Sequence, residues 1–297
     1  MAVATTANMA GERESLSDII TKIDSDETPI FTACKKETVN ATLVQWQIQE
    51  LASAGANSVS EGADASYATP TATTMLNNYT QISVKDFSIS GTLESVNKAG
   101  RAKETNYQRI LKGLELRRDI EKTIGDLNVA KSGSEPRKSA TLITWITNGD
   151  ATPSDISFGT GDGSDVADLA GTEASLTLAR IDNAVKAVWQ DGGRSRMLVC
   201  DATNKANISD LSQAGTNLVT NQVTTTKSQA PQFVGSVSVY LTDFGTLDIT
   251  PSRFMSDNVI HIIDPDHLKI GTLNGRNFSQ KTLSQTGDAL KLSLIHI

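Results

Sequence analysis

The stretch ATLVQWQIQE, residues 41–50, predicts one side of a long β-hairpin. In this stretch Val44, Trp46 and Ile48 alternate with glutamines, which is the period of a half-buried strand. The stretch YTQISVKDFSIS, residues 79–90, has the same strand character and predicts the returning side of the hairpin.

The returning stretch changes phase part-way along. Ile82 and Val84 alternate first, and Phe87 and Ile89 then alternate on the other phase. A change of phase at Lys85–Asp86 is typical of a β-bulge, which inserts one extra residue into a strand. The pattern therefore predicts a bulged strand at this position.

Between the two strands lie 28 residues, 51–78, that are rich in Ala, Ser, Thr, Gly and Asn. Structureless loops longer than about 12–15 residues are uncommon in compact domains, and are usually functional or disordered. An isolated two-stranded hairpin is only marginally stable in water. Two interpretations remain open: a flexible insert in a monomer, or an arm that lies on a neighbouring subunit.

The composition predicts a globular chain with a mainly aliphatic core. The 297 residues are 38% hydrophobic but only 5% aromatic, and no apolar run approaches the ~20 residues of a membrane span. The net charge of −7 argues against a protein that binds nucleic acid tightly. The opening MAVATTANMA resembles no secretory signal. Cys34 and Cys200 form no CxxC pattern, so we expect neither zinc nor a disulfide framework.

Residues 1–40 predict a polar arm that ends in an apolar anchor. A helix capped by Ser15 is expected from four apolar residues at helical spacing, which are Leu16, Ile19, Ile20 and Ile23. Pro29 is expected to break this helix. Ile30 and Phe31 follow as an anchor pair, which packs either on the chain's own body or on a neighbour.

Residues 92–131 predict one long helix, closed by Gly133 and Pro136. Its apolar residues recur at steps of three and four: Leu93, Val96, Tyr107, Ile110, Leu111, Leu114, Leu116, Ile120, Ile124 and Leu127. Within 101–122, seven basic residues outnumber four acidic ones. Arg117 and Arg118 are therefore candidates for weak contact with DNA. The alternative, which we prefer, is a solvated face with paired charges.

The second half of the chain predicts an α/β region and then a β-rich end. Residues 137–175 are a polar connector; the calcium-loop pattern is not met from Asp162, so a mobile surface loop is expected. The next expected elements are a helix over 176–193, a strand over 196–202, a helix over 204–212 and a strand over 234–244. Residues 245–297 contain strand-like runs, two of which are separated by the turn Asp264–Pro265–Asp266.

The sequence offers little for catalysis. His261, His267 and His296 have no carboxylate or cysteine partner at a motif spacing. No nucleophile elbow, Walker loop, dinucleotide-binding fingerprint or zinc-protease motif is present. We therefore expect no catalytic residue, no metal and no cofactor, and an enzyme is the poorer hypothesis.

Seven phrases, in this order, resemble the SU-ten-type major head protein family, which has the Hong Kong 97-type fold of tailed-bacteriophage capsid proteins. They are RESLSDIITKIDSDETPIFTAC, VQWQIQELASAGANSVSEGADA, NNYTQISVKDFSISGT, NKAGRAKETNYQ, LRRDIEKTI, VYLTDFGTLDITPSRFM and KTLSQTGDALK. They cover about 1–131 and 176–291, and none is catalytic.

The resemblance implies an α+β fold of five segments. They are an N-terminal arm (1–40), an extended β-hairpin loop (41–91), the spine helix of a peripheral domain (92–136), an α/β axial domain (137–244) and a β-rich return to the peripheral domain (245–297).

The resemblance also implies a function. The chain would be a major capsid protein that forms hexamers and pentamers of an icosahedral phage head around double-stranded DNA. Portal protein, and decoration or scaffolding proteins, would be its other partners. Its location would be the virion, and the host cytoplasm during assembly, with no membrane contact. An encapsulin-like nanocompartment shell is the alternative, and a soluble enzyme is a more distant one.

Subunit contacts are then expected at six apolar residues: Trp46, Ile48, Ile82, Phe87, Ile30 and Phe31. Some proteins of this fold cross-link a loop lysine to an asparagine of a neighbour. Residues 51–78 contain no lysine, so a non-covalent shell is expected.

Overall fold

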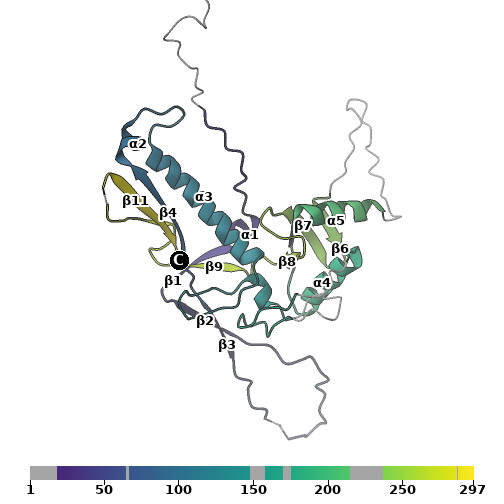
Figure 1. Ribbon diagram of the computed structural model, residues 1–297. Helices are drawn as coiled ribbons and strands as arrows, with labels where there is room; N and C mark the ends of the chain where they lie inside the picture. The colour runs from purple at the N-terminus through teal and green to yellow at the C-terminus, as the bar shows by residue number, and fades with distance from the viewer. Residues whose placement is uncertain (1–18, 65–66, 148–157, 170–174, 215–236, 286) are drawn as a thin grey trace, which may run out of the picture.

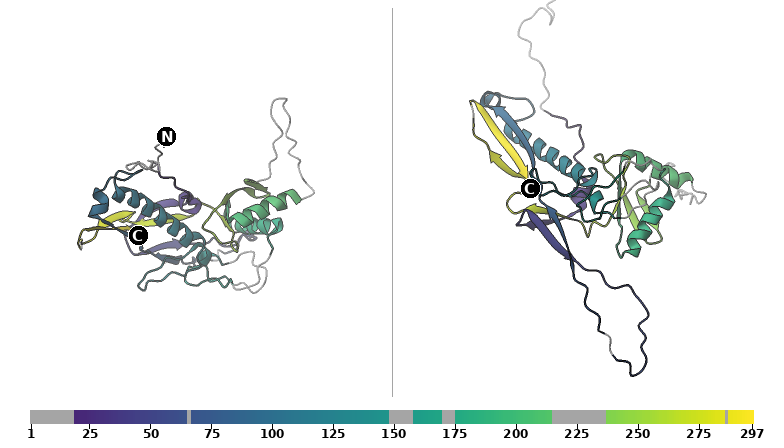
Figure 2. Two further views of the ribbon diagram at one scale, coloured as in Figure 1. Left: turned by 45° about the horizontal axis from the view of Figure 1, so that its top comes forward. Right: turned by 60° about the horizontal axis from the view of Figure 1, so that its bottom comes forward.

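A computed structural model describes residues 19–64, 67–147, 158–169, 175–214, 237–285 and 287–297. A long helix lies on a small sheet, a compact α/β part lies beside it, and a β-hairpin projects away from both (Figure 1). The right-hand view of Figure 2 shows the hairpin standing clear of the body from another direction. The expected mixed α+β class is confirmed.

The N-terminal arm enters the body at a short helix. Residues 19–28 have no helix, and α1 (Pro29–Ala33) follows them. The predicted helix is therefore wrong over 19–23, and its cap Ser15 lies outside the described residues. An amphipathic stripe sustains a helix mainly by packing, and Ile19 and Ile23 are 78% and 94% exposed. Pro29 starts α1 instead of ending a helix, since proline at the first helical position forfeits no hydrogen bond.

The hairpin is built from β2 (Leu43–Ile48) and β3 (Thr74–Tyr79), which follow β1 (Lys35–Val39). The two strands pair antiparallel, from Leu43 opposite Tyr79 to Ile48 opposite Thr74. The predicted returning strand, 79–90, is therefore wrong as the hairpin's second side. Its residues form β4 (Ser83–Ser90), which belongs to another sheet.

The predicted bulge in β4 is also wrong. Its register with β11 (Ala289–His296) runs without interruption from Ser83 opposite His296 to Ser90 opposite Ala289. Burial alternates strictly along β4, with Lys85, Phe87 and Ile89 on the more buried face. Lys85 occupies that face because its Nζ reaches the Asp119 carboxylate at 2.6 Å, whereas Val84 points outward and is 42% exposed. One inward lysine thus produces the apparent change of phase.

The predicted long helix is two helices. The side chain of Ser90 caps α2 (Gly91–Ser95), and α3 (Glu104–Gly125) begins after a turn in which Gly100 has φ of +75°. Residues 126–131 have left the helix, so its predicted end at Gly133 is wrong. At Gly125 a Cβ would lie 2.6 Å from the Cδ1 atom of Ile30, which shows how closely α1 packs on the end of α3.

Helix α3 covers one face of a three-stranded sheet in the order β10 (Ser279–Thr282), β11, β4. The core between them contains Leu116 and Ile120 of α3, Leu294 of β11 and Phe31 of α1. Beside this sheet, β1 pairs parallel with β9 (Lys269–Leu273). The first and last parts of the chain therefore build one body around α3.

The α/β part has a four-stranded sheet in the order β6 (Val239–Thr242), β7 (Gly245–Pro251), β5 (Met197–Cys200), β8 (His261–Ile263). Helices α4 (Leu178–Gln190) and α5 (Ala202–Ala214) contribute to its core. Their predicted positions are confirmed, as is that of β5. The predicted boundary at 245 is wrong, because β7 pairs parallel with β5 and β8 pairs antiparallel with it. The turn at 264–266 then leads to β9, and the amide N of Asp266 donates to Asp264 Oδ1 at 3.0 Å.

The predicted mobile connector is partly packed. Thr141 and Thr144, the latter in the 3-10 helix Leu142–Trp145, are 1% and 0% exposed. Lys131 Nζ donates to the backbone carbonyl of Asp162 at 2.7 Å. The described stretches on either side of the masked residues 148–157 therefore lie on the body as structural segments.

Candidate subunit-contact surface

The hairpin carries large apolar side chains that this chain leaves uncovered. Leu51, Val59 and Tyr67, in the loop beyond the strands, are 97%, 82% and 93% exposed. On the strands, Trp46 and Ile48 are 39% and 40% exposed. Exposed apolar residues gathered on one projection mark an interaction surface.

The base of the hairpin is tied to the body. Ala140 N donates to Asn78 Oδ1 at 3.0 Å, and Asn78 Nδ2 donates to Ser139 Oγ at 3.1 Å. The rings of Trp46 and Trp145 lie 5.5 Å apart between centroids. These contacts orient the strands while the loop beyond them extends away from the body.

Two of the predicted contact residues lie outside the hairpin strands. Ile82, between β3 and β4, is 46% exposed. Phe87 lies opposite Leu292 in β4 and is half-buried by the chain's own sheet and helix. The four residues Trp46, Ile48, Ile82 and Phe87 therefore do not form one continuous strand face.

Ile30 and Phe31 anchor the arm in the chain's own core. They are 0% and 8% exposed, so the side chain of Ile30 has no surface left for a neighbour, and its predicted contact is wrong. The amide N atoms of Ile30 and Phe31 donate to the two carboxylate oxygens of Glu121 at 2.9 and 2.7 Å. Burial raises the pKa of Glu121, although both amides favour its charged form.

Arg117 and Arg118 hold the same arm. Arg117 Nη2 donates to Thr28 Oγ1 at 2.9 Å, and its guanidinium lies 5.3 Å from the Phe31 ring centre. Arg118 lies 3.5 Å from the Asp24 carboxylate and 5.2 Å from the Phe254 ring centre. Both arginines therefore already have partners in the chain, which supports the paired-charge interpretation.

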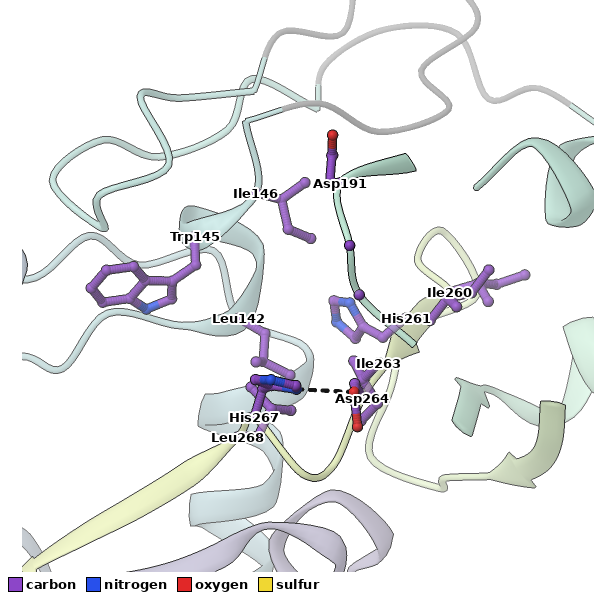
Figure 3. Close-up of a pocket in the computed structure, with 13 residues that line it drawn as sticks. Leu142, Trp145, Ile146, Asp191, Ile260, His261, Ile263, Asp264, His267 and Leu268 are labelled. Carbon is purple, nitrogen blue, oxygen red and sulfur yellow. Dashed lines mark hydrogen bonds and ion pairs between the residues drawn. The ribbon is translucent and has the colours of Figure 1, made fainter. Parts of the chain in front are cut away.

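A cavity of about 480 Å³ lies between the segment at Leu142–Trp145 and β8 (Figure 3). Its lining is mainly apolar. His267 Nδ1 lies 2.9 Å from Asp264 Oδ2 at its edge, but the His267 side chain is 81% exposed. His261 Nε2 is held by the carbonyl oxygen of Gly125 at 2.5 Å. The described lining residues contain no nucleophile for this pair to activate, so the cavity supports no reaction.

The remaining side chains with possible chemistry serve structure. In the described part of the chain, no group of three or more His, Cys, Asp or Glu is placed to hold a metal ion. Cys34 and Cys200 are both buried, and burial raises the pKa of the Cys200 thiol to about 11, so it is not a reactive thiolate. Among the described residues, no helix is long and apolar enough to cross a membrane.

Comparison with known families identifies the chain. Residues 3–296 match the family described as SU10 major capsid protein. The chain belongs to the SU10 major capsid protein family. A curated member of the wider group, the major capsid protein of Escherichia phage Phieco32, is 34% identical over 115 residues. Those residues are 38% of this chain and 33% of that protein, so the match spans about a third of the relative's length.

Solved structures show the same fold. The capsid asymmetric unit of cyanophage A-1(L) aligns with a TM-score of 0.64 at 12% identity, over 98% of this chain and 93% of that one. A chain from Microbacterium phage Oxtober96 aligns at 0.58 and 14% identity, over 99% and 91%. The capsid of a native GTA particle aligns at 0.62 and 11% identity, over 98% and 91%. This member of the SU10 family therefore has the predicted Hong Kong 97-type fold.

The sequence interpretation missed two parts of this surface. Leu51 and Tyr67 are single apolar residues in polar surroundings, and their isolation was the available signal. Glu121 gave no signal, because its partners Ile30 and Phe31 lie about 90 residues earlier.

Proposed function

We propose that this chain is the shell-forming subunit of a tailed-phage head, which assembles with copies of itself into hexamers and pentamers around double-stranded DNA. The projecting hairpin carries this proposal, because Leu51, Val59 and Tyr67 have nothing to pack on within the chain. Membership of the SU10 family supports it. Head-to-tail contacts of this kind close into rings.

Trp46, Ile48 and Ile82, with the uncovered part of Phe87, belong to the proposed contacts between subunits. Each contact can be modest, because a closed shell makes every subunit multivalent. Portal protein, and scaffolding or decoration proteins, are the further partners, with the virion as the final location and the host cytoplasm as the place of assembly. No reaction is assigned to the chain.

Electron microscopy of the purified protein tests the proposal. We expect closed shells from the intact chain and unassembled protein from a variant in which a short turn replaces residues 50–72. A species near 31.7 kDa at every concentration of the intact chain would contradict it. Nuclease-protected DNA inside particles recovered from infected cells separates a phage head from a nanocompartment, which would enclose protein cargo. A turnover screen on the same particles tests the enzyme alternative.

A further inference from the structure

A groove of about 430 Å³ lies where α3 meets the sheet strands β10 and β11. Its apolar surface comes from Ile110 and Leu114 of α3, from Leu294 of β11 and from Phe278. Ile110 is 63% exposed, although it lies in the middle of this apolar lining. Arg109 and Arg117 also line the groove, so it is apolar with a positive border.

Gly113 lies in the same groove, in the interior of the 22-residue helix α3. A glycine within a helix costs roughly 0.5–1 kcal/mol relative to alanine. The chain's own packing does not require it, since a Cβ would meet only the Cδ2 atom of Leu294, at an ordinary 3.8 Å. A glycine that its own fold does not need fits a place where another backbone approaches closely.

The charges select the occupant. From Glu37 to Val84 the sequence contains no lysine or arginine, and the loop of 49–73 contains Glu50, Glu61 and Asp64. The same loop exposes Leu51, Val59 and Tyr67 and is otherwise rich in small residues. An acidic, small-residue segment with spaced apolar side chains complements an apolar groove bordered by arginines.

The loop cannot come from the same molecule in the conformation seen here. In Figure 1 the hairpin formed by β2 and β3 projects from the opposite side of the body to the end of α3 that lies near β11. We propose that the groove around Gly113 receives the 49–73 loop of a second copy of this chain. This inference rests on the proposed shell function and assigns the surface that the hairpin contacts.

Substitution of Gly113 separates folding from assembly. Gly113→Ala adds a helix-favouring residue with space for its Cβ, so the melting temperature of the unassembled protein is expected to stay equal or rise. The protein concentration needed for assembly is expected to rise at least tenfold, and Gly113→Leu to abolish assembly. Asn106→Ala, an exposed position on the same helix outside the groove, is the matched control and should assemble as the wild type does. Normal assembly of both Gly113 variants would overturn the proposal.

Cross-linking locates the occupant directly. Tyr67 is replaced by a photoreactive phenylalanine analogue, shells are formed from mixed isotope-labelled and unlabelled chains, and linked peptides are identified by mass spectrometry. Links from position 67 to residues 109–117 or 278–280 of another copy are expected. Links to the α/β part, or groove links made instead by a probe at Ile23 of the arm, would overturn the groove assignment alone. Failure of the intact chain to form shells would overturn the proposed function as well.

Discussion

At the scale of single residues, Glu121 joins the N-terminal arm to α3. Its two carboxylate oxygens accept hydrogen bonds from the amides of Ile30 and Phe31, and the side chain is 1% exposed. Glu121→Ala would leave two buried amides without an acceptor, at about 1–3 kcal/mol each. We therefore expect the unassembled protein to lose on the order of 2–5 kcal/mol of unfolding free energy, measured by urea denaturation.

Glu115→Ala is the control for that measurement. Glu115 lies on the same helix and pairs with Lys112 at 2.8 Å, but its side chain is 36% exposed. A partly exposed pair of this kind contributes about 0–1 kcal/mol. Equal losses in the two variants would show that the Glu121 hydrogen bonds do not hold the arm.

His261 makes the stability depend on pH. Burial lowers its pKa below the ordinary value of about 6.5, and its Nε2 lies 2.5 Å from the Gly125 carbonyl oxygen. Because the unfolded chain takes up the proton first, stability is fully present above about pH 6.5 and is lost as the pH falls through the folded pKa. Burial also lowers the pKa of His296, which adds to the same slope.

His261→Gln keeps an N–H donor for Gly125 but removes the titrating group. We expect its unfolding free energy to fall less steeply than that of the wild type between pH 7 and pH 5, with the His296 contribution remaining. Denaturant midpoints across this pH range provide the measurement. Parallel curves for the two proteins would rule out the assigned role of His261.

At the scale of elements, the hairpin determines how subunits are joined. Residues 51–78 contain no lysine, and Lys85, the next one along the chain, lies in β4 and pairs with Asp119 at 2.6 Å. No loop amine is therefore available for a covalent bond to a neighbour. We expect assembled shells to give a single band near 31.7 kDa in denaturing gel electrophoresis, and a ladder of multimers would contradict this.

At the scale of the whole molecule, charge favours a container that encloses DNA without gripping it. The net charge is −7, and Arg117 and Arg118 are paired with Thr28 and Asp24. Each neutralised phosphate contributes about −0.9 to the slope of log affinity against log salt concentration. We expect weak binding of duplex DNA by the unassembled protein, with a slope worth roughly one or two phosphates.

The double variant Arg117→Ala/Arg118→Ala completes that experiment. Because both arginines hold the arm, we expect it to change protein stability more than DNA affinity. Tight binding of the wild type at physiological salt, lost in the double variant, would instead identify these residues as a DNA-binding surface. The salt series and a thermal melt on the same samples distinguish the two outcomes.

The sequence by itself determined those features that depend on neighbouring residues. The apolar spacing of Ile181 and Val185 predicted α4, and the apolar run Met197–Cys200 predicted β5. The turn at Asp264–Pro265–Asp266 followed from local side-chain chemistry. The lysine-free loop and the acidic charge needed no structure either, and the long polar insert between strands already indicated a projecting arm.

Only the tertiary structure decided which segments pair and what covers each apolar face. The polar stretch Thr74–Tyr79 is a strand because β2 lies beside it, while β4 pairs with β11, about 200 residues later. Lys85 faces inward because Asp119 is there to meet it. A period of two or 3.6 shows which side of an element is apolar, but long-range contacts determine its partner. For this reason Ile30 proved to be the chain's own core, while Leu51 and Tyr67 remain exposed for a neighbour.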